Sequence, residues 1–179
     1  EACKYSDSGE LILEKFEGGI QLSTESFILN ERCFTPAISE RNYGRFAQFS
    51  PNIIEDGGTV PADLSSELVI KINELILSGA KALGVDYGQI KGDLVLDHNG
   101  DPKIIELAAR LSGGWFASHQ ITAATGVNLV DIVISYALRD NIVEHQLKPS
   151  KKNSCAIRYW FPKSGKIKKI SGEAELKKI

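Results

Sequence analysis

The sequence predicts an α+β protein in which a mainly antiparallel sheet packs against helices. Two runs that favour strands, residues 90–97 and 103–109, flank Asn99-Gly100, and Asn-Gly between such runs is the strongest short-range signal for a β-hairpin. Residues 65–83 repeat apolar side chains at helical spacing, which is typical of a helix that packs on a sheet. These two features define the expected fold class.

The composition is that of an ordinary globular protein. Of 179 residues, 42% are apolar and 25% are charged, and the net charge is −2, which excludes long disorder, collagen-like repeats and a coiled coil. The near-neutral charge argues against a general nucleic-acid partner. Polar residues interrupt the longest apolar run, so we expect no membrane partner. Three scattered cysteines predict a reducing compartment, and hence a cytoplasmic location.

The first half of the chain contains two strand candidates and the helix. Residues 10–16 and 20–28 alternate well enough to predict strands. The stretch 30–60 is rich in loop-forming residues and holds one short strand candidate at 45–49. The helix of 65–83 follows, with side chains that can cap its start and a glycine that can end it.

The second half adds helices after the first hairpin. A glycine-containing loop at 111–115 precedes two helical segments, 121–125 and 128–138. The second segment is apolar on nearly all sides, and we therefore expect it to be buried.

A change of charge near position 147 predicts a boundary. Residues 148–179 carry ten basic and two acidic residues, a net charge of +8. Within them, 156–161 and 166–170 predict a second hairpin. We therefore expect a main domain of residues 1–147 and a basic β-hairpin appendage of residues 148–179. A nucleic-acid module is an alternative interpretation of this basic part, and a solvated face is favoured.

The first hairpin brings two acids together. With Asn99-Gly100 as a two-residue turn, Asp93 faces Glu106, and directly opposed side chains have Cβ atoms about 4.5–5.5 Å apart. Two such carboxylates repel unless a cation lies between them, and oxygen ligands of this kind suit Mg²⁺ or Mn²⁺. The alternative, that both acids lie on a solvated face separated by Lys91, stays open at this point.

The same turn fixes the rest of the register. Val95 is then expected to face Ile104. Because side chains alternate between the two faces of a sheet, the face opposite the acids is expected to belong to the core. Its side chains are Leu94, Leu96, Ile105 and Leu107.

Segments 91–97 and 104–114 resemble the metal-binding hairpin of the ATP-grasp superfamily. Segment 13–18 before the hairpin and segment 124–129 after it also fit the family order. The branch with carbamoyl-phosphate synthetase, biotin carboxylase and the purine ligases is the most similar, and the resemblance covers roughly residues 1–172. It implies the C-terminal lobe of an ATP-grasp enzyme.

The resemblance also implies where a nucleotide binds. In this family ATP lies between two lobes, and adenine enters a hinge where it meets mainly backbone groups. The matching residues, called here the hinge segment, are Glu14, Lys15, Phe16 and Glu17. The phosphate-binding flap and its lysine come from the lobe before the hinge. The resemblance therefore implies a missing N-terminal lobe of the same protein as a partner, and weak ATP binding by this chain alone.

Further roles follow from the same resemblance. Asp93 and Glu106 match the two acids that bridge Mg²⁺ to the ATP phosphates, and Arg110 matches the arginine that holds the γ-phosphate or an acyl phosphate. Carboxylate and acceptor substrates approach through a loop. The residues of that loop are Ser112, Gly113 and Gly114.

The implied activity is that of an ATP-dependent carboxylate–amine ligase, which phosphorylates a small-molecule carboxylate and transfers the acyl group to a nucleophile. One position departs from the family pattern: Ala108 stands where many relatives have a metal-binding asparagine. A catalytically inactive nucleotide-binding or structural domain is therefore the alternative. The sequence leaves a homodimer open.

Overall fold

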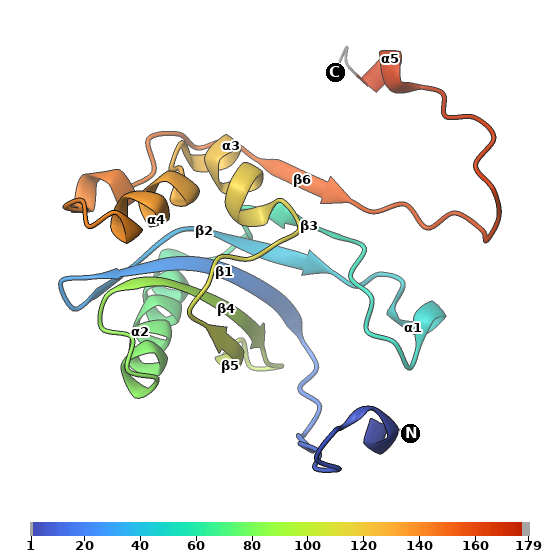
Figure 1. Ribbon diagram of the computed structural model, residues 1–179, viewed down its shortest axis with the longest axis horizontal. Helices are drawn as coiled ribbons and strands as arrows, with labels where there is room; N and C mark the ends of the chain where they lie inside the picture. The colour runs from blue at the N-terminus through green and yellow to red at the C-terminus, as the bar shows by residue number, and fades with distance from the viewer. Residues whose placement is uncertain (1, 177–179) are drawn as a thin grey trace.

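A computed structural model describes residues 2–176 and shows one six-stranded sheet flanked by helices (Figure 1). Every neighbouring pair of strands is antiparallel, in the order β5-β4-β1-β2-β3-β6. The predicted α+β class with a mainly antiparallel sheet is confirmed. The strands are β1 (Ile20–Leu29), β2 (Arg32–Asn42), β3 (Gly57–Val60), β4 (Gly88–Leu96), β5 (Pro102–Ala108) and β6 (Cys155–Arg158).

The helices are short except for α2. The α-helices are α1 (Phe46–Phe49), α2 (Ser66–Ala82), α3 (Ile121–Thr125), α4 (Leu129–Ala137) and α5 (Glu173–Leu176). Two 3₁₀-helices, η1 (Ala2–Tyr5) and η3 (Glu144–Leu147), and one π-helix, η2 (Phe116–Gln120), are also present among residues 2–176. Within residues 2–176, no helix is both long and apolar enough to cross a membrane.

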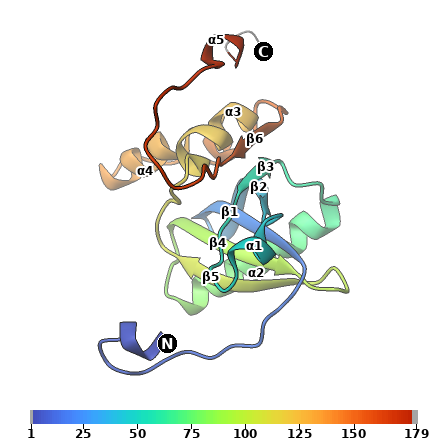
Figure 2. The ribbon, with the colours of Figure 1, turned by 90° about the vertical axis from the view of Figure 1, so that its right-hand side faces the viewer.

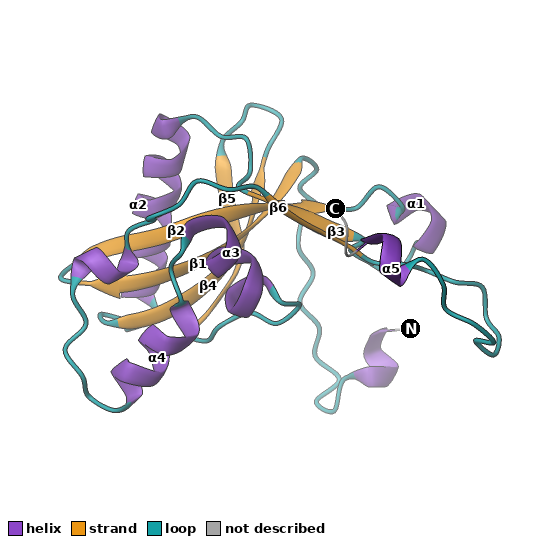
Figure 3. Ribbon diagram, turned by 90° about the horizontal axis from the view of Figure 1, so that it is seen from above, coloured by secondary structure: helices purple, strands orange, loops and turns teal. Residues whose placement is uncertain are grey.

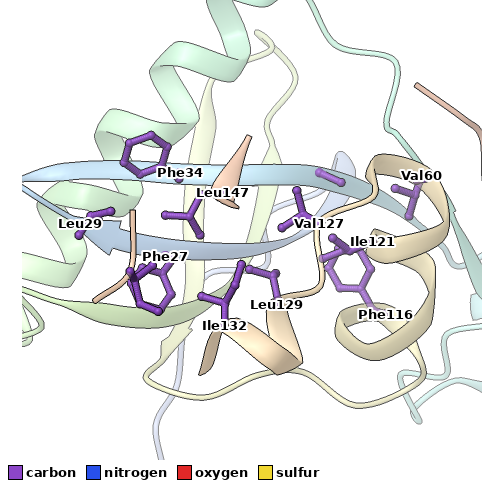
Figure 4. Close-up of a cluster of buried hydrophobic side chains, with 13 residues drawn as sticks. Phe27, Leu29, Phe34, Val60, Phe116, Ile121, Val127, Leu129, Ile132 and Leu147 are labelled. Atoms are coloured by element: carbon purple, nitrogen blue, oxygen red, sulfur yellow. The ribbon is translucent and has the colours of Figure 1, made fainter. Parts of the chain in front are cut away.

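The sheet separates two hydrophobic clusters. Helix α2 covers one face, whereas α3 and α4 lie over the other (Figures 2 and 3). Phe27 and Ile28, neighbours on β1, point to opposite faces and belong to different clusters. Figure 4 shows the cluster beneath α3 and α4. Its labelled members are Phe27, Leu29, Phe34, Val60, Phe116, Ile121, Val127, Leu129, Ile132 and Leu147.

Helix α2 confirms the predicted helix. The side chain of Ser65 accepts a hydrogen bond from the Leu68 amide and so caps the first turn. Ile72, Ile76 and Ala80 are spaced by four residues and are all fully buried against the sheet. The same periodicity that predicts the helix therefore also predicts the face that packs.

Strand β2 corrects the expectation that residues 30–60 are mostly loop. Between the pairs Glu25–Ala37 and Phe27–Phe34, one residue of β1 lies opposite two residues of β2. One of these two is Pro36, which cannot donate a backbone hydrogen bond, and a bulge is where a sheet tolerates proline. The predicted short strand at 45–49 is also wrong, because this segment forms helix α1.

The predicted strand at residues 10–16 is wrong. This segment is exposed and extends away from the sheet (Figure 2). Strand β1 already pairs with β4 on one side and β2 on the other, so it offers no free edge to the segment that precedes it. Alternating side chains alone did not indicate that a pairing partner was lacking.

The predicted C-terminal hairpin is wrong as well. Strand β6 pairs with β3, with Cys155 opposite Val60, and residues 166–170 belong to no strand. The first half of the expected hairpin therefore extends the main sheet. The boundary at residue 147 stays a prediction.

Gly19, which directly precedes β1, is expected to tolerate no side chain without a large loss of stability. Its φ is +144°, and a Cβ there would lie 1.8 Å from the carbonyl oxygen of Leu96 on β4. We expect Gly19→Ala to lower the free energy of unfolding by at least about 2 kcal/mol, because the two backbones must separate. Gly84→Ala is the control, since Gly84 has φ +73° but open space around it, and should cost about 1 kcal/mol. Urea denaturation of both variants tests this, and equal losses would contradict it.

Candidate active site

The hairpin of β4 and β5 has a longer turn than predicted. The loop spans Asp97 to Asp101 in place of a two-residue turn. The Asp97 carboxylate accepts hydrogen bonds from the amides of Asn99 (2.9 Å) and Asp101 (3.0 Å), which closes the loop. As a result, Val95 faces Lys103. The predicted pairing of Val95 with Ile104 is therefore wrong.

A bulge restores the register at the acids. The pairing shifts by one residue between Asp93 and Leu94, and Ile105 is the extra residue on β5. Asp93 is therefore paired with Glu106, as predicted. The bulge also moves side chains: Ile104 packs against the α2 cluster, whereas Ile105 is 50% exposed. The predicted core face is correct for the three leucines and wrong for Ile105.

Asp93 is held by three side chains from three strands. Its Oδ1 accepts a hydrogen bond from Ser23 Oγ at 3.0 Å and lies 3.2 Å from Arg41 Nη1. Its Oδ2 is in contact with Lys91 Nζ. Arg41 also pairs with Glu55. The two cations compensate the buried side of the carboxylate, and burial of an unpaired charge would be costly.

Glu106 and Arg110 complete the group. Glu106 is more than half exposed, and its Oε1 lies 3.6 Å from Arg110 Nη2. The structure therefore brings together the three charged residues that the family resemblance selects. Among residues 2–176, no group of three or more His, Cys, Asp or Glu side chains is arranged to hold a metal ion.

An apolar cavity of about 570 Å³ adjoins this hairpin. The hinge segment lines it along one side, and Ile105 lines it from β5. Phe16 stacks on Phe46 with ring centroids 6.4 Å apart. The remaining lining residues are Gly19, Ile20, Gln21, Glu40, Arg41, Tyr43 and Ile53.

A smaller, polar cavity of about 290 Å³ lies beside Ser112, Gly113 and Gly114. Arg41 lines both cavities, so the two meet at the residue that contacts Asp93. The remaining lining residues are Ser23, Ser39, Glu55, Gly58, Lys91, Arg110, Phe116, Gln120, Ile157 and Tyr159.

Glu25 anchors the loop that borders the polar cavity. It is fully buried on β1, and its Oε1 accepts a hydrogen bond of 2.6 Å from the Ser112 amide. Burial raises the pKa of Glu25 to about 7, although the bonds from Ser112 and the charges of Lys91 and Arg110 oppose the shift.

Sequence reasoning missed Glu25, Arg41 and Glu55. Glu25 belongs to four consecutive polar residues, 23–26, inside a predicted strand, and this break in the alternation was the available signal. Arg41 and Glu55 lie in the stretch that was predicted to be loop, so nothing indicated that Arg41 would contact Asp93 or that Glu55 would pair with Arg41.

Comparisons with known proteins identify the architecture. No protein-family model and no curated protein matches the sequence. The chain is similar in structure to an L-amino acid ligase from Bacillus licheniformis, with a TM-score of 0.78 and 24% identity over 92% of this chain. It is also similar to a protein from Archaeoglobus fulgidus assigned to the ATP-grasp superfamily, with a TM-score of 0.56 and 19% identity over 80% of this chain. The chain has an ATP-grasp fold.

A third similar structure carries bound ligands. It is the biotin carboxylase domain of the Hydrogenobacter thermophilus 2-oxoglutarate carboxylase, in complex with MgADP, ADP and bicarbonate. The TM-score is 0.52, with 14% identity over 69% of this chain. The ATP-grasp chain spans 41%, 40% and 25% of these three proteins, respectively. The resemblance seen in the hairpin motifs is thus confirmed at the level of the fold.

Proposed function

We propose that this ATP-grasp chain serves an ATP- and Mg²⁺-dependent carboxylate–amine ligase. The observation that carries the proposal is the cross-strand pair of Asp93 and Glu106 with Arg110 beside it. Arg110 lines the polar cavity, and Arg41, which contacts Asp93, lines both cavities. The apolar cavity can hold a base, and the polar cavity can hold a small polar substrate.

The apolar cavity is the proposed site of the adenosine. Its volume of about 570 Å³ lies within the range of about 300–1,000 Å³ that is usual for ligand pockets. Its walls are mainly apolar, which suits a flat base, and the four residues of the hinge segment are among those that line it. The similar biotin carboxylase domain binds MgADP, which supports a nucleotide here.

The chemistry of the two acids fits Mg²⁺. In proteins this ion is usually held by one or two carboxylates together with phosphate oxygens and water, so Asp93 and Glu106 suffice without the asparagine that Ala108 replaces. Bound Mg²⁺ would supply positive charge to the phosphates. Because Lys91 and Arg41 already pair with Asp93, we expect the ion to bind together with the nucleotide rather than alone.

The chain's own residues would support two steps. A carboxylate oxygen attacks the γ-phosphorus, the bond to the β-phosphate oxygen breaks, and ADP leaves. An amine nitrogen then attacks the acyl carbon, phosphate leaves, and the nitrogen loses a proton. Arg110 would neutralise charge on the transferring phosphoryl group. Glu25, through the Ser112 amide, would hold the loop that borders the substrate.

We also propose that a second lobe is needed for activity. The site lies on one side of the sheet, and the chain spans at most 41% of the three similar proteins described above. A charge pair at 4 Å gains only about 1 kcal/mol in water, against about 4 kcal/mol at a protein-like surface. We therefore expect this chain alone to bind MgATP at least about tenfold more weakly than the complete protein. Calorimetry on both tests this, and equal affinities would contradict it.

A non-catalytic nucleotide-binding domain is the second candidate. Ala108 in place of a metal ligand and the pairing of Asp93 with two cations favour it. ADP formation by the complete protein, in the presence of MgATP, an amine and a small carboxylic acid, separates the two. Acid-stimulated ADP formation supports the ligase. Binding of MgATP without any ADP formation supports the second candidate.

Ile105 offers a direct test of the nucleotide cavity. Ile105→Asp should weaken MgADP binding at least about tenfold, because it removes an apolar wall worth about 1.5 kcal/mol and adds a charge that repels phosphate. Ile134→Asp on α4 is the matched control, since Ile134 is 53% exposed and lies outside the cavity. Calorimetric titration with MgADP should show the loss only for Ile105→Asp. Equal affinities for both variants would place the nucleotide elsewhere.

A further inference from the structure

One residue of the polar cavity has a buried polar atom without a hydrogen-bond partner. It is Gln120, whose Oε1 is unpartnered and whose side chain lines the cavity. Gln120 itself is only 6% exposed. A buried polar atom without a partner costs about 1–3 kcal/mol, so a ligand that donates a hydrogen bond to Gln120 Oε1 would be favoured.

Three cations reach the same cavity. Arg41 comes from β2, Lys91 from β4, and Arg110 from the segment that follows β5. Each of them is already paired with a protein carboxylate: Arg41 with Asp93 and Glu55, Lys91 with Asp93, and Arg110 with Glu106. A ligand carboxylate would share these cations, whose N–H donors can bind more than one oxygen. Gln120 offers both a donor and an acceptor in its amide, and Ser112 offers a hydroxyl. These two groups can bind an uncharged polar substituent that the cations would not recognise.

The dimensions limit the ligand to a small molecule. A volume of about 290 Å³ lies at the lower end of the range for ligand pockets. Phe116, Ile157 and Tyr159 complete the wall and can contact a short carbon chain between the two polar ends. A long aliphatic or large aromatic acid would have to displace them.

We propose that the polar cavity binds a small carboxylic acid whose side chain ends in an uncharged, hydrogen-bonding group, and that Gln120 selects for that group. The proposal rests on the proposed ligase function, because it names the class of acid that would be activated. Its basis is that Gln120, whose buried Oε1 has no hydrogen-bond partner, lines the same cavity as Arg41, Lys91 and Arg110. An apolar acid of the same shape would leave Gln120 Oε1 buried and unpaired, so the polar acid is favoured.

Pairs of acids with the same shape test the selection. The probes are L-asparagine against L-leucine, L-threonine against L-valine, and succinamate against 4-methylpentanoate. Each pair is titrated into the protein by calorimetry without nucleotide. In at least one pair, we expect the polar acid to bind at least about tenfold more tightly, as for sites that hydrogen-bond their substrate. If no polar acid binds more tightly than its partner, or none of the six binds, the proposal is overturned.

Two variants assign the selection to Gln120. Gln120→Met keeps the length of the side chain and removes the amide, and should reduce the preference to less than about twofold. Gln89→Met is the matched control, because Gln89 Oε1 is also buried and unpartnered but Gln89 does not line the cavity. That variant should keep the full preference. A preference that persists in Gln120→Met, or that is lost equally in Gln89→Met, would overturn the role of Gln120.

Two further measurements are needed. The first shows whether Gln120 selects the acid or only stabilises the fold. The second shows whether a negative result concerns Gln120 or the proposed ligase function. Gln120→Met should raise the melting temperature, because an unpartnered buried amide is removed. A variant that unfolds at a lower temperature and loses acid binding would show that Gln120 is structural, which overturns the proposal. The titrations contain no nucleotide, so failure of the ligase proposal would instead show as absent MgATP binding or absent ADP formation.

Discussion

Glu106→Gln is expected to abolish ATP-dependent ligation in the complete protein, with a loss of at least about 10³-fold in rate. A neutral amide leaves Asp93 as the only carboxylate of the pair, and Asp93 is already compensated by Lys91 and Arg41. Loss of one group that stabilises charge in a transition state costs about 10²–10³-fold, and loss of the metal would add to this. ADP formation in the presence of MgATP, acid and amine measures the effect.

The fold should survive this change. Glu106 is 57% exposed and its contact with Arg110 is a surface pair, so we expect the free energy of unfolding to change by less than about 1 kcal/mol. Glu74→Gln, an exposed glutamate on α2, is the control and should keep full activity. Ligation at the normal rate by Glu106→Gln would contradict the assignment of the metal carboxylates.

Glu25→Gln is expected to stabilise the protein at pH 8 but not at pH 4.5. The folded-state pKa of Glu25 is raised to about 7 from the ordinary 4.5, because the group is buried. Between these pH values the folded state binds more protons than the unfolded state, so stability falls as pH rises. The loss amounts to about 3 kcal/mol when it is complete above pH 7. Glutamine cannot ionise and can still accept the hydrogen bond from the Ser112 amide.

Chemical denaturation across this pH range tests the prediction. The difference in unfolding free energy between Glu25→Gln and the wild type should grow from pH 4.5 to pH 7.5 and then level off. Lys91 and Arg110 are the charged groups whose fields act on Glu25. Glu74→Gln should show no such change. A difference that is independent of pH would mean that Glu25 ionises normally.

The parts of the fold with local signals were predictable. Helix α2 has a cap and a buried stripe within one stretch of chain. The pairing of Asp93 with Glu106 was predicted from Asn99-Gly100, although the turn is longer and a bulge at Ile105 compensates for it. The longer turn shifts the register by one residue, and the bulge shifts it back at Asp93 and Glu106. The exposed position of Ile105 is the visible sign of these two shifts.

The parts that depend on distant contacts were not predictable. Strand β2 contains Pro36, and only its bulge against β1 shows how proline fits in the sheet. Glu25 meets Ser112 across 87 positions in the sequence, so its buried state has no local signal beyond a polar run. Residues 10–16 alternate like a strand, but whether they pair depends on which edges of the sheet are free.

Transfer of oxygen from the acid to phosphate tests whether the acid is activated as an acyl phosphate. The complete protein is incubated with MgATP, an amine, and an acid whose carboxylate is labelled with ¹⁸O. If the carboxylate attacks the γ-phosphorus, one labelled oxygen must leave with the phosphate when the amine displaces it. We expect one ¹⁸O in each phosphate released during ligation, and no released phosphate from Glu106→Gln. Phosphate that is released without label during ligation would contradict this expectation.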